Sequence, residues 1–354
     1  MTDTLLPWHK PQWDSLQARQ TTGTLPHALL LCGPNGVGKL IFAEHFAKAL
    51  LCNAADRHAR PCGICKQCIL FAAGSHPDLH VVQPESIYNK SDTLLAKYSL
   101  RYPVEGKSKD SKDSTAMRID QIRALIAGNQ TRPQLAANKV IILNPADTLN
   151  KNAANSLLKT LEEPTPDSVL ILVTDRPASL PATVRSRCQR VLFHKPPAIQ
   201  ARAWLQPQIP VGQDLEALLA VAEGAPLRAL ALAQGDALQR RQTLFSDLAQ
   251  VACAAADPLA VAAGWLKSDI KETLDWLRTG VMDMIRLKTV GQSRLVNRDL
   301  GKELQRLADG LDLQALYGHL DRLTQAASLA DTSINNQLLL EDILIPWTVT
   351  RQAH

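Results

Sequence analysis

The chain has 354 residues, which suggests roughly two or three domains, and 45% of them are hydrophobic, enough for real cores. Its seven cysteines are clustered, which favours a metal site in a reducing compartment over a disulfide framework. Residues 1–10 lack the pattern of a signal peptide, and no run reaches about 18 apolar residues, so we expect a cytoplasmic protein that does not cross a membrane.

Positive charge is concentrated in the N-terminal part of the chain. Residues 1–190 hold 23 Lys and Arg against 16 Asp and Glu, a balance of +7, whereas residues 191–354 hold 16 against 18, a balance of −2. The basic part favours a polyanion nearby, either nucleic acid or nucleotide. A solvated surface of mixed charge explains the same totals equally well.

Short β-rich runs alternate with helical patterns over residues 1–195, which predicts an α/β domain. The predicted strands are residues 28–32, 79–83, 139–143 and 168–174, and the predicted helices are residues 41–51, 118–128 and 152–163. Residues 85–115 interrupt this pattern with Ser, Lys and Asp, and we interpret them as an exposed polar insertion.

The pair Pro196-Pro197 marks the first domain boundary. Beyond it, residues 196–237 predict a small helical domain, and residues 238–354 predict a second, larger helical domain. The expected architecture is therefore α/β plus all-α, in three domains.

A phosphate-binding loop is almost complete between the first strand and the helix that follows it. Residues 33–40 read GPNGVGKL, which matches the glycines and the lysine of a P-loop at Gly33, Gly38 and Lys39, with Gly36 between them. The backbone N–H groups of such a loop cradle phosphates, and Lys39 can reach them as a point charge. The sequence therefore predicts a nucleotide-type site, although a degenerate one.

The groups that support a catalytic metal are missing from the expected positions. Leu40 stands where a P-loop has the Ser or Thr hydroxyl that holds Mg²⁺. The third predicted strand ends in Asn144-Pro145, where a hydrolase carries an acidic pair. We therefore expect no hydrolysis, and we leave open whether ATP or ADP binds.

Four cysteines have the spacing of a structural zinc site. Cys52, Cys62, Cys65 and Cys68 form the pattern C-x9-C-x2-C-x2-C in a module of residues 52–68. Four thiolates complete a tetrahedral zinc site and leave no open position, so the metal is expected to be structural. Plain thiols or a redox pair are the alternatives.

Three further side chains are candidates for contact with phosphate. Arg187, in the triplet Ser186-Arg187-Cys188, follows the fourth strand and can extend into a neighbouring subunit as an arginine finger. Arg228 can approach a phosphate bound in cis, and Thr174 ends its strand where it can touch a γ-phosphate. Taken alone, each arginine is more often an ordinary surface charge, and Thr174 is also explained as an ordinary strand-end hydroxyl.

The order of these motifs resembles the bacterial clamp-loader subunits of DNA polymerase III, within the AAA+ superfamily. The residues that carry the resemblance are the P-loop, the cysteines, the segment SHPD at 75–78, the run NSLLKTLEEP at 155–164 and the triplet at Arg187. Within this family the gamma/tau subunits hydrolyse ATP, whereas the delta-prime group typically does not. Leu40, Asn144 and Pro145 make the chain similar to the delta-prime group.

The resemblance implies an AAA+ α/β domain, a helical lid domain and a helical collar domain. It implies gamma/tau and delta subunits as partners in a hetero-pentamer that loads the sliding clamp onto primed DNA. It also implies that Arg187 serves the ATP site of a neighbouring gamma/tau subunit in trans, and that the chain has no independent catalysis.

Two other interpretations remain open at this point. The first is an active ATPase of the gamma/tau type, in which Asp147 replaces the lost acidic residue. The second is a zinc-stabilised DNA-binding protein that acts alone, which predicts tight, salt-dependent binding to DNA.

Overall fold

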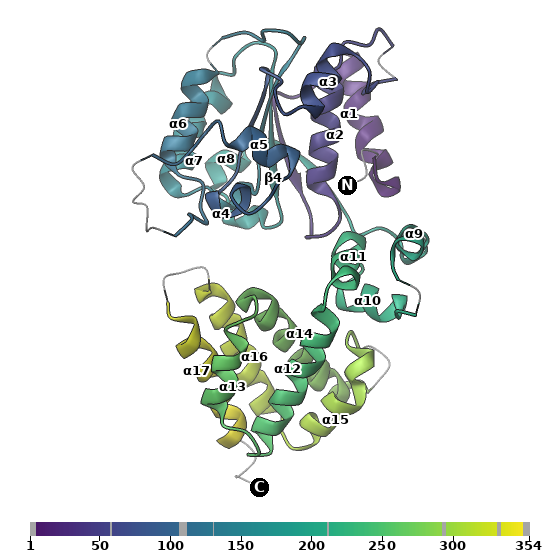
Figure 1. Cartoon of the computed structure of the whole chain (residues 1–354), viewed down its shortest axis with the longest axis vertical. Coiled ribbons are helices and arrows are strands. Elements are labelled where there is room, and N and C mark those ends of the chain that lie inside the picture. Colours follow the sequence, from purple (N-terminus) through teal and green to yellow (C-terminus); the bar gives the residue numbers. More distant parts are fainter. Residues whose placement is uncertain are drawn as a thin grey trace. The chain divides into compact units, whose positions relative to one another are not determined.

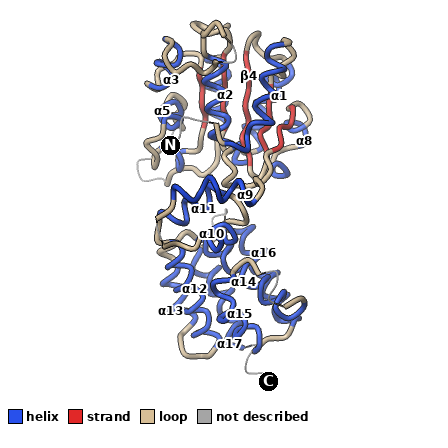
Figure 2. The backbone as a smooth tube through the Cα atoms, turned by 90° about the vertical axis from the view of Figure 1, so that its right-hand side faces the viewer, coloured by secondary structure: helices blue, strands red, loops and turns tan. Residues whose placement is uncertain are grey.

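The computed structural model describes residues 5–56, 59–105, 112–129, 131–210, 212–291, 295–330 and 334–349. It divides the chain into two compact units, Met1–Gln200 and Ala201–His354. Among the described residues, strands occur only in the first unit, and the second is helical (Figure 2). The α/β plus all-α class is therefore confirmed, whereas the division of the second unit into lid and collar domains stays a prediction.

The first unit is built on five parallel strands, and the α/β pattern predicted four of them. The strands are β1 (Ala28–Cys32), β2 (Leu79–Val82), β3 (Lys139–Leu143), β4 (Ser168–Thr174) and β5 (Gln189–Leu192). Their order in the sheet is β2-β3-β4-β1-β5, and all four pairings are parallel. Because β1 and β4 are neighbours, with Cys32 opposite Thr174, the segments that follow these two strands begin side by side.

Helices cover both faces of this sheet and its edge at β2. They are α1 (Lys10–Thr21), α2 (Lys39–Leu51), α3 (Lys66–Ala72), α4 (Glu85–Tyr88), α5 (Leu94–Ser99), α6 (Ile119–Gly128), α7 (Lys151–Glu162) and α8 (Ala182–Arg185). Figure 1 shows α6 and α7 on one side of the strands and α2 on the other. Leu30, Ile141 and Leu170 pack in one cluster with α6 and α7, and alternate strand residues such as Ile142 and Ile171 face the opposite side.

The predicted exposed insertion at residues 85–115 is wrong for the part that the structure describes. Tyr88 of α4, Leu95 and Tyr98 of α5, and Tyr102 just after α5 are buried, and α5 packs on the edge strand β2. Aromatic residues scattered through a polar sequence thus cover a sheet edge that would otherwise be exposed. Most of the Lys- and Ser-rich patch lies at residues 106–111, outside the described residues.

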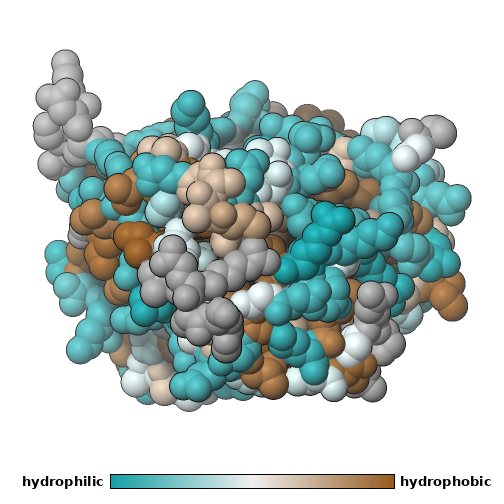
Figure 3. Space-filling model, turned by 90° about the horizontal axis from the view of Figure 1, so that it is seen from below, coloured by the Kyte–Doolittle hydropathy of each residue, from teal (hydrophilic) through white to brown (hydrophobic). Residues whose placement is uncertain are grey.

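The second unit is a set of helices around one hydrophobic cluster that extends from Ala201 to Trp347. The helices are α9 (Ala198–Leu205), which starts in the first unit, α10 (Leu215–Val221), α11 (Pro226–Gln234), α12 (Ala237–Ala252), α13 (Pro258–Trp265), α14 (Ile270–Thr289), α15 (Gly301–Asp309), α16 (Leu313–Leu329) and α17 (Asn336–Val349). Hydrophilic and hydrophobic residues are interspersed on the face seen from below (Figure 3). Helices α16 and α17 contribute the exposed hydrophobic residues Leu313, Tyr317, Leu338 and Ile345.

Candidate functional site

The predicted P-loop connects β1 to α2, and its glycines are required by geometry. Gly36 and Gly38 have φ angles of +78° and +91°, a region that residues with a Cβ atom rarely adopt. A Cβ at Gly33 would lie 2.1 Å from the backbone oxygen of Phe193, and one at Gly38 would lie 2.4 Å from Cδ1 of Leu6. The loop is therefore held tightly between the residues that follow β5 and those that precede α1.

Lys39 turns back on its own loop. Its Nζ atom donates to the backbone oxygens of Gly33 (2.8 Å) and Pro34 (2.6 Å) and lies 2.6 Å from Oδ1 of Asp175. An ammonium group has three hydrogens, so these three acceptors satisfy it completely. A phosphate that enters the loop has to replace at least one of these partners.

The segment before α1 closes a further part of the loop, which the sequence did not indicate. Nε1 of Trp8 donates to the backbone oxygen of Val37 at 2.8 Å, and Nε2 of His9 lies 2.8 Å from the same oxygen. Burial lowers the pKa of His9 to about 4. The hydrogen bond to Val37 acts to raise this pKa, and the positive charge of the nearby Lys39 acts to lower it. His9 is therefore neutral at pH 7, and it donates to Val37 through a protonated Nε2.

Thr174, the predicted γ-phosphate contact, is bound to Asp147 in this structure. Its hydroxyl donates to Oδ1 of Asp147 at 2.7 Å, and Arg176 donates through Nε to Oδ2 of the same carboxylate at 3.1 Å. Both oxygens of Asp147 thus have partners within the chain. This arrangement disfavours Asp147 as a replacement metal ligand, and Leu40 offers no hydroxyl to assist it.

Arg228 belongs to the second unit, where it pairs with Asp275. Arg278 donates to the other oxygen of Asp275 at 2.7 Å. Burial acts to raise the pKa of Asp275, but the bonds from Arg278 and Arg228 outweigh it, so the pKa is lowered and the carboxylate is ionised. The assignment of Arg228 to a nucleotide stays a prediction.

Arg187 lies between α8 and β5 and is anchored to two neighbouring elements. Its Nε and Nη2 atoms lie 2.9 and 2.5 Å from Oε1 of Glu162, the last residue of α7. Its Nη1 atom donates to the backbone oxygen of Thr183 at 3.0 Å. The side chain of Arg187 remains 36% exposed, so it is held in place yet accessible from outside the chain.

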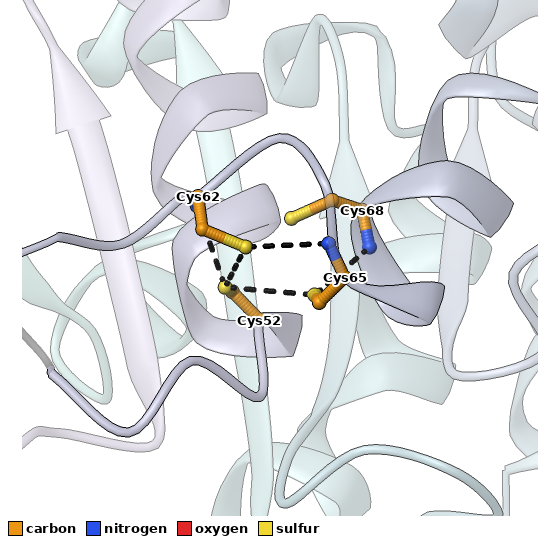
Figure 4. Close-up of side chains that lie close together, drawn as sticks. All are labelled: Cys52, Cys62, Cys65 and Cys68. Carbon is orange, nitrogen blue, oxygen red and sulfur yellow. Dashed lines mark hydrogen bonds between the residues drawn. The ribbon is translucent and has the colours of Figure 1, made fainter.

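The four predicted cysteines converge after α2 and at the start of α3 (Figure 4). Their sulfur atoms all lie within 4.8 Å of one another, and Sγ of Cys52 lies 3.5 Å from that of Cys62 and 3.8 Å from that of Cys65. Tetrahedral zinc with Zn–S bonds of about 2.3 Å places its sulfurs about 3.8 Å apart. The four thiols therefore fit one zinc ion.

Backbone N–H groups approach the sulfurs and favour thiolate at part of this cluster. Burial acts to raise the pKa of Cys65, but the N–H of Cys68 and neighbouring donors outweigh it and lower the pKa to about 6. Burial raises the pKa of Cys68 to about 12. Gly63 has a φ angle of +74°, which lets the chain turn between Cys62 and Cys65.

The segment SHPD contains a structural carboxylate that the sequence did not explain. Asp78 is fully buried, and its oxygens accept the backbone N–H groups of Gln134, Leu135 and Ala136 at 2.6 to 2.8 Å. Burial acts to raise its pKa, but these three bonds together lower it. Asp78 thus fastens the loop before β3 to the start of β2.

The strand order, with the P-loop after β1 and Thr174 at the end of the adjacent β4, defines a P-loop protein of the AAA+ type, as predicted. The family model described as "DNA polymerase III, delta subunit" matches residues 8–197, and its C-terminal counterpart matches residues 235–349. Together with 34% identity to a subunit delta' over nearly the whole chain, these matches show that the chain belongs to the delta-prime family of DNA polymerase III subunits.

Individual relatives agree with this assignment. The chain is 34% identical to DNA polymerase III subunit delta' of Pseudomonas aeruginosa, over 97% of each chain. It is 31% identical to the Escherichia coli subunit delta', over 96% of this chain and 94% of the relative. Similarity to the Bacillus subtilis subunit tau, at 32% identity, covers 48% of this chain and 25% of that one. Within the described residues, no helix is long and apolar enough to span a membrane.

Proposed function

We propose that this chain is a delta-prime subunit of a DNA polymerase III clamp loader and helps to place the sliding clamp on primed DNA. Its partners in this proposal are the gamma/tau and delta subunits, in a hetero-pentamer in the cytoplasm. Similarity to delta' relatives extends over almost the whole chain, which supports this role. Similarity to the tau relative covers only about half of this chain.

We further propose that the chain does not hydrolyse ATP itself. Leu40 supplies no hydroxyl for Mg²⁺, and Asn144 and Pro145 supply no carboxylate. Asp147 is engaged by Thr174 and Arg176, and Lys39 by its own loop and Asp175. A catalytic site needs metal ligands and a lysine directed at the nucleotide; here the ligands named above are missing, and the lysine is bound within the chain.

The observation that carries the proposal is Arg187, a partly exposed guanidinium in a domain whose own P-loop site is degenerate. A chain that lacks its own metal ligands can still supply this cation to the ATP site of a neighbouring gamma/tau subunit. There it would stabilise negative charge in the transition state for phosphoryl transfer.

The cysteine cluster completes the proposal as a structural zinc site. Cys52, Cys62, Cys65 and Cys68 would hold the ion, which would fasten the start of α3 to the end of α2. A closed shell of four thiolates leaves no position for water or substrate, so the metal would contribute folding free energy rather than catalysis.

Two measurements test the proposed function. ATP binding and hydrolysis are measured for the isolated chain and for Lys39→Ala, and we expect no turnover from either. Turnover that disappears in Lys39→Ala would instead identify an active ATPase of the gamma/tau type.

The second measurement uses the assembly reconstituted with gamma/tau and delta. We expect Arg187→Ala to depress its DNA-stimulated ATPase rate while the variant still folds and assembles. An unchanged rate would remove the arginine-finger assignment. Tight, salt-sensitive DNA binding by the isolated chain would favour a DNA-binding protein that acts alone.

A further inference from the structure

Glu162 and Arg187 lie 25 positions apart in sequence and are joined by two contacts, from Nε and Nη2 of the arginine to one carboxylate oxygen. We propose that Glu162 is a positioning residue, which orients the guanidinium of Arg187 toward a phosphate in the neighbouring subunit. This inference rests on the proposed function of Arg187 as a group that acts in trans.

The place of Glu162 in its helix supports this role. It is the last residue of α7, where the helix dipole disfavours a carboxylate. The side chain is 51% exposed, so packing does not require this residue type. A glutamate at this position is unfavourable for the helix by itself and is offset by its cationic partner, Arg187.

The two elements that anchor Arg187 belong to one rigid core. Leu161 of α7, beside Glu162, and Val184 of α8, beside Thr183, are both buried in the cluster that packs on the sheet. The backbone at Glu162 and the carbonyl of Thr183 are therefore held in fixed positions relative to each other. A guanidinium bound to the side chain of Glu162 and to this carbonyl has little freedom left to lose when it meets a ligand.

The contacts leave part of the guanidinium available. Arginine has five N–H groups, and the bonds to Glu162 and Thr183 use three of them. Ser186 Oγ lies 3.5 Å from Nη1, at the limit of a hydrogen bond. One hydrogen of Nη2 and the weakly engaged one of Nη1 therefore remain for phosphate oxygens, which guanidinium groups bind in a forked geometry.

The test measures ATPase rates of the assembly reconstituted with gamma/tau and delta, with four variants of this chain: Glu162→Gln, Arg187→Ala, the double variant and Glu163→Gln. For wild type and for Glu162→Gln, the Arg187-dependent rate is the measured rate minus the rate with Arg187→Ala. We expect Glu162→Gln to lower this quantity about two- to fivefold, the range of a partly exposed ion pair. The loss should appear in kcat, since the contact acts in the transition state.

The double variant separates positioning from a general structural effect. If Glu162 acts only through Arg187, the double variant has the same rate as Arg187→Ala. Glu163→Gln removes a neighbouring carboxylate and should keep the full rate. Thermal unfolding of each isolated variant checks that the chain still folds.

The outcomes separate this inference from the proposed function. An Arg187-dependent rate that Glu162→Gln leaves unchanged, or raises because Glu162 withholds the arginine, overturns the positioning role alone. A rate that is lower in the double variant than in Arg187→Ala also overturns the positioning role, since Glu162 would then act by a route other than Arg187. No Arg187-dependent rate at all means that the finger assignment fails, and the positioning role fails with it.

Discussion

Nζ of Lys39 lies 2.6 Å from Oδ1 of Asp175, so the lysine of the P-loop is paired with the residue that follows β4. The pairing is a consequence of sheet order, because β1 and β4 are adjacent and their C-terminal ends are in register. Asp175 thus puts a negative charge where a nucleotide would bring another. The carboxylate and a phosphate compete for the same ammonium group.

Asp175→Asn should therefore strengthen ATP binding by the isolated chain. Asp175 is 42% exposed, and pairs of this kind contribute about 0.2–1 kcal/mol, so we expect a Kd up to about fivefold lower than that of wild type. Equilibrium titration with ATP measures the change.

Two variants control this titration. Lys39→Ala should abolish binding, and Asp92→Asn, at a side chain that is 95% exposed, should leave it at the wild-type value. Equal or weaker binding by Asp175→Asn would show that the carboxylate does not compete with phosphate.

Replacement of Cys62 and Cys65 by Ser should release zinc and destabilise the first unit. A structural zinc site provides folding free energy directly, so the loss should appear as a lower Tm together with less zinc per chain. Metal analysis and thermal unfolding of protein purified without oxygen measure both quantities. Cys253→Ser is the matched control, since Cys253 lies outside the cluster and should keep the metal. Wild-type protein without zinc would contradict the assignment.

Three buried histidines should lower the free energy of unfolding as the pH falls. Burial lowers the pKa values of His9, His80 and His319 to about 4, below the value of about 6.5 in the unfolded chain. The unfolded state therefore binds more protons between these values, so stability is full above about pH 6.5 and is lost as the pH falls. From pH 7 to pH 5 the loss is on the order of 1–2 kcal/mol per histidine.

Urea unfolding at pH 7 and pH 5 measures this loss. His9→Gln should reduce the pH dependence, because the amide can still donate to Val37 but does not titrate. The exposed His194, replaced in the same way, should leave it unchanged. Equal pH dependence in wild type and His9→Gln would show that His9 is not the neutral, buried group inferred here.

Asp78→Asn should destabilise the first unit by about 1–3 kcal/mol. Its carboxylate accepts three backbone N–H groups, and the amide would turn a donor toward at least one of them and leave it unsatisfied. Urea unfolding gives the difference, with Asp92→Asn as the exposed control. A change within about 0.5 kcal/mol, as at an ordinary surface site, would mean that the loop keeps its bonds in another way.

Buried parallel strands were predictable from the sequence because each is a continuous apolar run. Three of the four predicted strands have the bounds found in the structure, and the fourth ends one residue earlier, at Val82. The edge strand β5 was missed, since its residues Gln189–Leu192 are largely exposed and form no such run. The burial of Tyr98 and Tyr102 was missed because single aromatic residues in a polar segment give no periodic signal.

The sequence by itself determined the P-loop, the cluster of four cysteines and the arginine at position 187, because these depend on residue type at fixed local spacing. Tertiary structure alone decided the partners of these groups: Asp175 for Lys39, Asp147 for Thr174 and Glu162 for Arg187. The physical reason is that the order of strands in a sheet, rather than distance along the chain, brings the ends of separate elements within hydrogen-bond reach of one another.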